Sequence, residues 1–154
     1  MILYRSCSYK YQHVLSGSGA RINGGRWNNP GKAALYTSET KSLAMLEVLT
    51  NTPLAILRSD FSIITIEITG SFSTDEYTLK DLPSGWNEYP VPIAIIRMGD
   101  RWLTAAKSLL LRVPSAIVPS ECNLIINPAH PDFGKVKITG TEKLVIDKRV
   151  EQNL

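Results

Sequence analysis

Glycine dominates the segment that follows the first few residues, and this limits what the chain can fold into there. Five of the ten glycines fall between Gly17 and Gly31, in the run SGSGARINGGRWNNPG. Glycine loses more backbone entropy on folding than any other residue, so it weakens the interior of helices and strands. We therefore expect residues 6–33 to be mostly loop, and a loop of this length is typical of functional segments.

The same segment carries only positive charge. No Asp or Glu precedes Glu39, whereas five basic residues do: Arg5, Lys10, Arg21, Arg26 and Lys32. Glycine lets backbone N–H groups approach a ligand, and arginine offers a planar fork to phosphate oxygens. One interpretation is that the segment holds an anion such as a phosphate or pyrophosphate. The alternative is a solvated basic loop.

The rest of the chain predicts a single α+β domain over residues 1–154. Alternation of Ile64, Ile66 and Ile68 with polar residues predicts a strand over 61–69. Helices are expected over 39–50, capped by Ser38 and buried on all sides, and over 93–108. Further short strands are expected near 1–5, 34–37, 109–113, 136–139 and 143–147, with one more within 71–92, and residues 124–126 form a short apolar stretch among prolines. The absence of regular strand–helix alternation argues against a doubly wound parallel sheet.

Composition narrows the classes of function. The net charge is +3 without a cluster of Lys or Arg, which suits an anionic small molecule or an acidic partner and does not demand nucleic acid. Cys7 and Cys122 form no CxxC motif and are expected as free thiols. We find no signal peptide and no run of membrane-spanning length, so we expect a cytoplasmic protein. His13 and His130 have no ligand spacing with the cysteines, so no metal site is expected.

Glu47 is the first candidate for chemistry. It is the one charged residue between Ser42 and Thr50, on an otherwise apolar helix. A carboxylate does not stay ionised in a dry interior without partners. It therefore either pairs with an arginine as a structural contact or faces a cleft and takes part in a reaction, and Arg5 and Arg26 are natural partners in both cases.

Three further residues are candidates for ligand contacts. Arg26 lies in GGRWN, which is compatible with a nucleotide pocket or with a tight turn anchored by Trp27. Tyr36 is expected either to stack on an aromatic ring or to be a core tyrosine with its hydroxyl satisfied. Ser115 and Ser120 lie in VPSAIVPS outside any GxSxG motif, so we expect one of them to donate a hydrogen bond to a ligand rather than to act in a hydrolase triad.

The motifs in their order resemble the RES-domain family, the toxin half of bacterial RES–Xre toxin–antitoxin modules. The resemblance is carried by YR at residues 4–5, by SGSGARINGGRWNNPG, LYTSETKSLAMLEVL and MGDRWL, and by LRVPSAIVPSECNLIINPAHPDF. It implies an ADP-ribosyltransferase-like fold with short, mostly antiparallel strands in small sheets flanked by helices. It also implies site residues, which are Arg5, Arg26, Tyr36, Glu47 and Ser115. Asn123, Asn127 and His130 match a downstream pattern and are assigned a scaffolding role.

The resemblance further implies that the protein acts on NAD as a substrate and needs no metal. The expected activity is cleavage of the nicotinamide–ribose bond, which depletes NAD by hydrolysis or phosphorolysis and arrests growth. Arg5 and Arg26 would clamp the phosphates, Tyr36 would pack against the nicotinamide or its ribose, Glu47 would stabilise the sugar cation and Ser115 would orient the ribose or amide.

Two alternatives stay open at this point. One is a mono-ADP-ribosyltransferase that modifies a protein target, and the other is a non-catalytic phosphate- or nucleic-acid-binding module. The implied partner is an Xre-like helix-turn-helix antitoxin, and contact with nucleic acid is expected only through that antitoxin.

Overall fold

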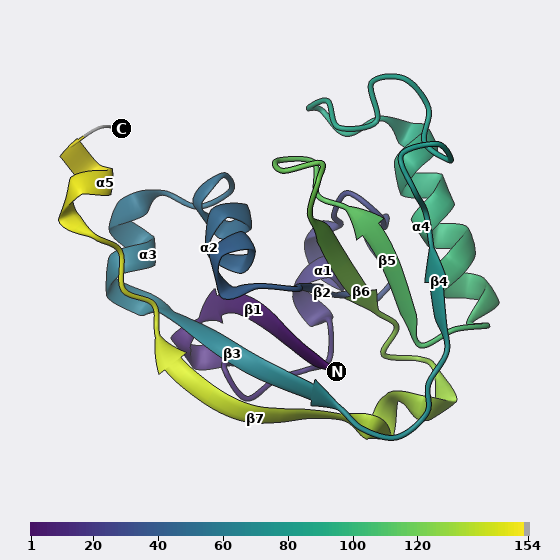
Figure 1. The fold of residues 1–154 in the computed structure, drawn as a ribbon, viewed down its shortest axis with the longest axis horizontal. Coiled ribbons are helices and arrows are strands. Elements are labelled where there is room, and N and C mark those ends of the chain that lie inside the picture. The colour runs from purple at the N-terminus through teal and green to yellow at the C-terminus, as the bar shows by residue number, and fades with distance from the viewer. Residues whose placement is uncertain (153–154) are drawn as a thin grey trace.

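A computed structural model describes residues 1–152, and its framework is one sheet of seven strands (Figure 1). The strands are β1 (Ile2–Ser8), β2 (Leu35–Ser38), β3 (Phe61–Ile68), β4 (Thr74–Glu76), β5 (Leu110–Pro114), β6 (Cys122–Ile126) and β7 (Val136–Lys143). They lie in the order β4-β5-β6-β2-β1-β3-β7. The β4–β5 pair is parallel and the other pairs are antiparallel.

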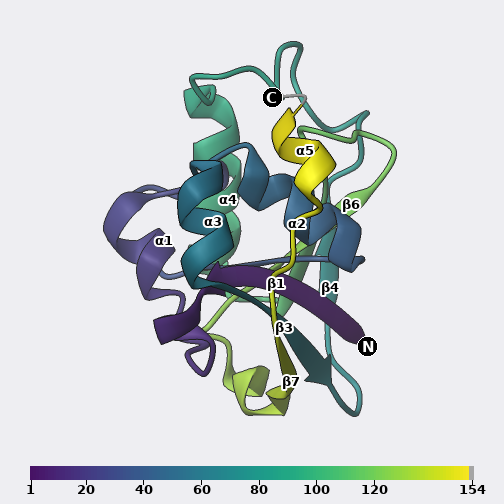
Figure 2. The same cartoon turned by 90° about the vertical axis from the view of Figure 1, so that its left-hand side faces the viewer.

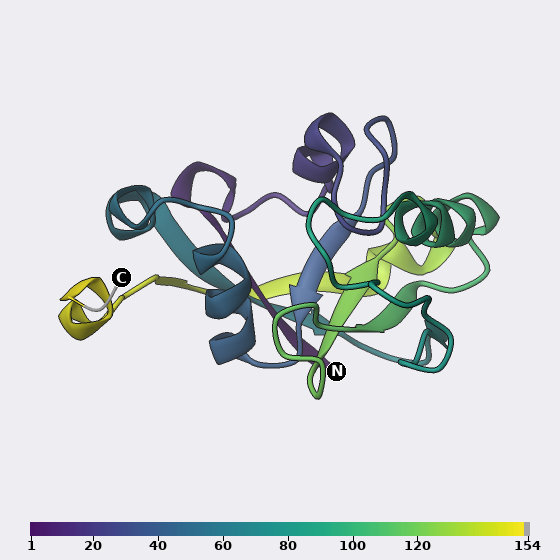
Figure 3. The same cartoon turned by 90° about the horizontal axis from the view of Figure 1, so that it is seen from above.

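Helices cover the two halves of this sheet separately. They are α1 (Ser18–Asn23), α2 (Lys41–Leu49), α3 (Leu54–Asp60), α4 (Ile93–Ala105) and α5 (Lys148–Gln152), with 3-10 turns at Tyr9–Tyr11 and Pro131–Lys135. Helices α2 and α3 lie over the β1 and β3 side, and α4 lies over the β4, β5 and β6 side, as the views from the side and from above also show (Figures 2 and 3). No helix within residues 1–152 is long and apolar enough to cross a membrane.

The core follows the alternation of side chains along the strands. In β5, Leu110 packs into one apolar cluster together with β1 and β3, whereas its neighbour Leu111 packs under α4 with Trp102. Ile125 in β6 likewise lies on the α4 side. Successive residues of a strand point to opposite faces, so a sheet covered on both sides needs apolar residues at consecutive positions. This explains the unbroken runs LLL and LII in the sequence.

The strand pairing is weakest in the middle of the sheet, between β1 and β2, and we call this junction the seam. These two strands pair only at Tyr4 and Ser38, whereas β1 pairs with β3 along its whole length and β2 pairs with β6 along its whole length. Arg5 lies beside the seam, and its Nη1 donates to the carbonyl oxygen of Tyr36 at 3.0 Å. A side chain therefore bridges the two halves where the strand ladder ends.

The α+β class and the short, mostly antiparallel strands are confirmed, although the strands join in one sheet rather than in several small ones. Two expectations about α2 are wrong. Its N-cap is Thr40, whose side chain accepts from the N–H of Leu43 at 3.1 Å, because β2 continues through Ser38. The helix is not buried on all sides either: Leu43 and Ala44 are buried, but Leu46 is 36% exposed, since only one face packs on the sheet.

Other departures have local causes. Two strands were expected within 136–147, but the chain forms one strand, β7, which continues through Gly140. A bulge between Thr65 and Ile66 accommodates the extra residue of β7 opposite β3. The segment 6–33 contains a 3-10 turn and helix α1, and after Pro53, where the sequence indicates a short turn through Leu57, residues 54–60 form helix α3.

Candidate functional site

Glu47 lies in the last part of α2, and its carboxylate is held by one oxygen. Oε1 accepts from the hydroxyl of Ser115 at 2.8 Å and from the side-chain amide of Asn123. Within residues 1–152, no hydrogen bond or ion pair reaches the second oxygen, Oε2. The carboxylate is thus fixed in position while one of its oxygens stays available to a ligand.

Ser115 follows β5 and is completely buried. Its Oγ accepts from the N–H groups of Ile117 and Val118 at 3.1 Å each and donates to Glu47. The hydroxyl therefore anchors the turn after β5 and the carboxylate together. The sequence suggested a direct contact between Ser115 and a ligand, but all of its hydrogen-bonding capacity is used inside the chain.

Asn123 in β6 is a site residue whose link to Glu47 the sequence analysis missed. Its Oδ1 accepts from the hydroxyl of Ser38 at 2.7 Å, while its amide nitrogen donates to Glu47. The signals in the sequence were its match to the downstream pattern and its place as a polar residue at the start of the apolar run LII, and neither points to Glu47. Asn127 and His130 make framework contacts instead: Asn127 donates to the carbonyl of Leu103, and the ring of His130 accepts from a backbone N–H two residues on.

Arg26 connects the glycine-rich segment to the loop that precedes α4. Its Nη1 donates to the carbonyl oxygens of Trp86 at 2.9 Å and Glu88 at 3.2 Å. Burial lowers the pKa of Arg26, and the negative charge of Glu47 nearby opposes that shift. The expected direct pairing of Glu47 with an arginine is not found among the described residues, so the two groups interact across space rather than through a hydrogen bond.

The guanidinium of Arg5 is the most enclosed cation of the candidate site. The residue as a whole keeps some exposed surface, but its charged end is closely surrounded and burial lowers its pKa. Its hydrogen bond goes to a neutral carbonyl. Within residues 1–152 neither Arg5 nor Arg26 forms an ion pair. A buried cation without a counter-ion is costly, so Arg5 favours a bound anion, and the half-buried Arg26 favours one less strongly.

The hydroxyl of Tyr36 is satisfied within the protein. It donates to Asn28 Oδ1 at 2.7 Å and accepts from the N–H of Trp27 at 3.0 Å. Burial raises the pKa of Tyr36, so the phenol is neutral at physiological pH. Gly25 makes this arrangement possible, because a Cβ at that position would lie 2.6 Å from the Tyr36 hydroxyl.

Three glycines of the segment do not offer their N–H groups to an anion. The N–H groups of Gly24, Gly25 and Gly31 donate to carbonyls of the same segment, at 2.8, 3.0 and 2.7 Å. The idea of a glycine cradle for phosphate is therefore wrong at these three positions. Gly24 and Gly25 serve close packing and Gly31 serves a backbone with φ +101°, which leaves the guanidinium groups as the stronger anion-binding candidates.

Helix α4 holds the segment in place. Asp100 accepts from the backbone N–H of Asn29 at 3.0 Å and from its side-chain amide at 2.8 Å. Beside it, Gly99 lies so close to Trp27 that a Cβ would be 1.9 Å from the Trp27 carbonyl oxygen. The MGDRWL motif thus docks α4 against GGRWN.

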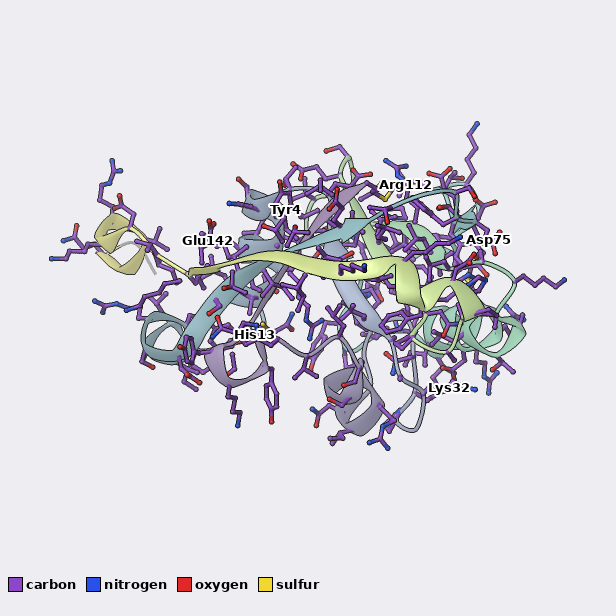
Figure 4. All side chains as sticks on the ribbon, turned by 90° about the horizontal axis from the view of Figure 1, so that it is seen from below. Tyr4, His13, Lys32, Asp75, Arg112 and Glu142 are labelled. Atoms are coloured by element: carbon purple, nitrogen blue, oxygen red, sulfur yellow. The ribbon has the colours of Figure 1, made fainter. Side chains whose placement is uncertain are left out.

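Two hollows of about 570 and 560 Å³ border β7, and both are lined by His13 and Thr141. Figure 4 labels His13 on the side of β7 where the chain after β1 runs. None of the five expected site residues lines either hollow. We place the candidate site at Glu47 because two side chains anchor its carboxylate and Arg26, which forms no ion pair among residues 1–152, is near enough for the two charges to interact. Among the described residues, no three His, Cys, Asp or Glu side chains gather as a metal site would require.

Comparison with known proteins identifies the family. The RES domain model matches residues 2–147. A protein of Photorhabdus laumondii named Toxin Res is 43% identical over 137 residues, which cover 88% of this chain and 86% of the relative. A protein of Sphingobium named Prs ADP-ribosylating toxin is 38% identical over 138 residues, with coverage of 88% and 86%.

A solved structure shares the fold. The M. tuberculosis MbcT–MbcA toxin–antitoxin complex contains a chain that matches with a TM-score of 0.73 and 21% identity, over 99% of this chain and 87% of that one. At this identity the likeness concerns the fold alone. The family model and the relatives reach further, because they match nearly the whole sequence. The chain belongs to the RES domain family.

Proposed function

We propose that this protein is the toxin of a toxin–antitoxin module and that it cleaves NAD between nicotinamide and ribose. Membership in the RES family and the relatives named Toxin Res support the toxin assignment. The choice of NAD is supported by the charges of the site. NAD carries a diphosphate, two riboses and a cationic nicotinamide, and the site offers two cations and one carboxylate.

The proposal is carried by three charged groups without an ion pair among the described residues: Glu47, Arg26, whose charge interacts with that of Glu47, and Arg5, which is bound to the backbone of Tyr36. Arg5 and Arg26 donate only to neutral carbonyls, and Glu47 is held by Oε1 with Oε2 left over. A diphosphate would supply the counter-charge that the guanidiniums lack, and arginine can bind it through two parallel hydrogen bonds. A carboxylate with one free oxygen is suited to accept from a ribose hydroxyl.

The proposed reaction needs no proton transfer to the leaving group. When the bond between the ribose C1′ and the nicotinamide nitrogen breaks, its electron pair goes to the ring nitrogen, and nicotinamide leaves neutral. Positive charge develops on the sugar, as in other glycoside cleavage. Glu47 stabilises that charge and holds a ribose hydroxyl, while Arg5 and Arg26 fix the diphosphate. Tyr36 offers its ring to the nicotinamide side.

The acceptor of the sugar decides the product. Water adds a hydroxyl group to C1′ and releases a proton, which gives ADP-ribose; phosphate adds through oxygen and gives ADP-ribose 1″-phosphate. A second candidate function is transfer to a protein side chain, which is favoured by the relative named Prs ADP-ribosylating toxin at 38% identity. All three share the first half of the reaction.

One experiment tests the cleavage and separates the acceptors. Purified protein is incubated with NAD labelled in its adenine, with and without phosphate and cell extract, and the products are resolved by chromatography. Cleavage releases free nicotinamide. Label in ADP-ribose or its phosphate indicates depletion of NAD, and label in a discrete protein band indicates transfer. Protein that binds NAD but releases no nicotinamide under any of these conditions would contradict the proposal.

We also propose that an Xre-like helix-turn-helix antitoxin covers the site and that the pair acts in the cytoplasm, where NAD is abundant. The fold neighbour is part of a toxin–antitoxin complex. The cationic Arg5 and Arg26 would attract an acidic or carboxylate-bearing segment of such a partner. Added antitoxin should then suppress nicotinamide release, and this suppression should weaken as NAD is raised.

A further inference from the structure

Ser38 and Asn123 form a hydrogen-bonded pair directly behind the carboxylate of Glu47. Ser38 Oγ donates to Asn123 Oδ1 at 2.7 Å, and Asn123 Nδ2 donates to Glu47 Oε1. The two residues lie opposite each other in β2 and β6, and Ser38 is almost completely buried. The pair therefore connects two central strands of the sheet to the end of α2.

The donor and the acceptor of each hydrogen bond in this network follow from the chemistry of the groups. An ionised carboxylate only accepts, so Ser115 and Asn123 both donate to it. The oxygen of Ser115 already accepts from two backbone N–H groups, so its single proton points to Glu47. Asn123 must turn its NH₂ toward Glu47, which leaves its carbonyl oxygen toward Ser38, and Ser38 donates to it.

We infer that Ser38 and Asn123 are positioning residues, which hold Glu47 by Oε1 and so keep Oε2 as the oxygen that the substrate can reach; this inference rests on the proposed cleavage of NAD. Within residues 1–152, the Ser38 hydroxyl is the side-chain partner of Asn123 Oδ1, so its loss leaves the carboxylate alone to orient the amide. A flipped amide would bring its oxygen against the carboxylate, and the two would repel each other. A preorganised charge loses its catalytic value when its orientation is no longer fixed.

The kinetic test compares Ser38→Ala and Asn123→Leu with a matched control, Thr37→Val. The Thr37 hydroxyl is also buried between β2 and β6, where it donates to the carbonyl of Leu124 at 2.7 Å, but it has no link to Glu47. We expect kcat for nicotinamide release to fall about 10- to 100-fold in Asn123→Leu and roughly 3- to 10-fold in Ser38→Ala, with KM changed less than about threefold. Ser38→Thr keeps the hydroxyl and should restore kcat. Equal losses in Ser38→Ala and Thr37→Val would overturn the inference.

A spectroscopic test needs no activity and does not require Asn123→Leu to fold. In ¹⁵N-labelled protein, the side-chain amide signals of Asn123 report directly on its two hydrogen-bond partners. They should shift in Glu47→Ala and in Ser38→Ala, and stay in place in Thr37→Val. If the wild type releases no nicotinamide, the proposed function fails. The chemical shifts would still show whether Asn123 is hydrogen-bonded to Glu47 and Ser38. Asn123 signals that do not move in Glu47→Ala would overturn the inference whatever the substrate.

Discussion

The hydroxyl of Ser115 donates to Glu47 Oε1 at 2.8 Å, although 68 residues separate the two in the chain. The contact joins the turn after β5 to the end of α2, and it crosses from one half of the sheet to the other. Because Ser115 is completely buried, it acts on any ligand through Glu47. The acid and the serine therefore form one unit, in which the hydroxyl sets the position of the carboxylate.

Glu47→Gln should reduce the rate of nicotinamide release about 10²- to 10³-fold, which is the typical effect of removing one preorganised electrostatic contact in a transition state. The amide keeps an oxygen that can accept from Ser115 and Asn123, so the fold should be retained. Turnover at saturating NAD measures the effect, and circular dichroism checks the fold. A folded Glu47→Gln variant with wild-type turnover would remove Glu47 from the mechanism.

Arg26→Lys should weaken NAD binding by about 10- to 100-fold, the range for loss of a charge-assisted hydrogen bond. Arg26 uses Nη1 for two backbone carbonyls and has further N–H groups for phosphate oxygens. A lysine ammonium lacks the planar guanidinium group, so it cannot bind the backbone carbonyls and the phosphate oxygens equally well. Isothermal titration with NAD measures the change in Kd.

Arg21→Lys is the matched control for Arg26→Lys. Arg21 lies in the same segment and is exposed on α1. The replacement keeps the net charge of the segment and should leave the Kd for NAD unchanged. Equal weakening by both substitutions would contradict a special part for Arg26, and an unchanged Kd in both would mean that the segment attracts NAD through its overall charge alone.

The local patterns of the sequence were enough for much of the fold. The alternation of Ile64, Ile66 and Ile68 predicted β3, and all three side chains are buried in the core as expected. Glu47 stood out as a lone charge on an apolar helix, and the structure gives its carboxylate polar partners. Such features depend on neighbours within a few residues, so the sequence displays them directly.

The contacts that the sequence could not predict depend on strand register. Asn123 reaches Glu47 only because β6 pairs with β2 at Ser38, and no local pattern encodes that pairing. The glycines were expected to expose N–H groups, whereas Gly25 instead gives space to the Tyr36 hydroxyl. The sequence alone does not tell whether a glycine leaves space for a ligand or for a neighbouring side chain.

Gly99→Ala should lower the free energy of unfolding by about 1–3 kcal/mol or more, as overpacking does in a tight interface. The added Cβ would lie 1.9 Å from the Trp27 carbonyl oxygen, so α4 would have to move away from the glycine-rich segment. Urea denaturation measures the loss. Gly19→Ala is the control, because a Cβ on Gly19 in α1 meets no atom within 4 Å and alanine favours a helix. A Gly99→Ala variant as stable as Gly19→Ala would contradict the close packing of α4 on Trp27.

Tyr36 should give the protein a loss of stability at alkaline pH. In the unfolded chain a tyrosine releases its proton near pH 10, whereas burial raises the pKa of Tyr36 in the folded protein. Above about pH 10 the unfolded state therefore holds fewer protons than the folded state, and the free energy of unfolding falls by up to about 1.4 kcal/mol per pH unit. Below pH 10 the phenol is neutral in both states, so Tyr36 adds no pH dependence there.

Tyr36→Phe isolates this contribution. At neutral pH the variant should be less stable than the wild type by about 1–3 kcal/mol, because Asn28 and the N–H of Trp27 lose their partner. That difference should shrink between pH 10 and 11.5, since phenylalanine has no proton to release in the unfolded state. Urea denaturation at several pH values measures it. Thr37→Val is the control, because it removes a buried hydroxyl that does not titrate in this range. Its free energy of unfolding should differ from that of the wild type by a constant amount across these pH values. A Tyr36→Phe difference that is equally constant would contradict the raised pKa.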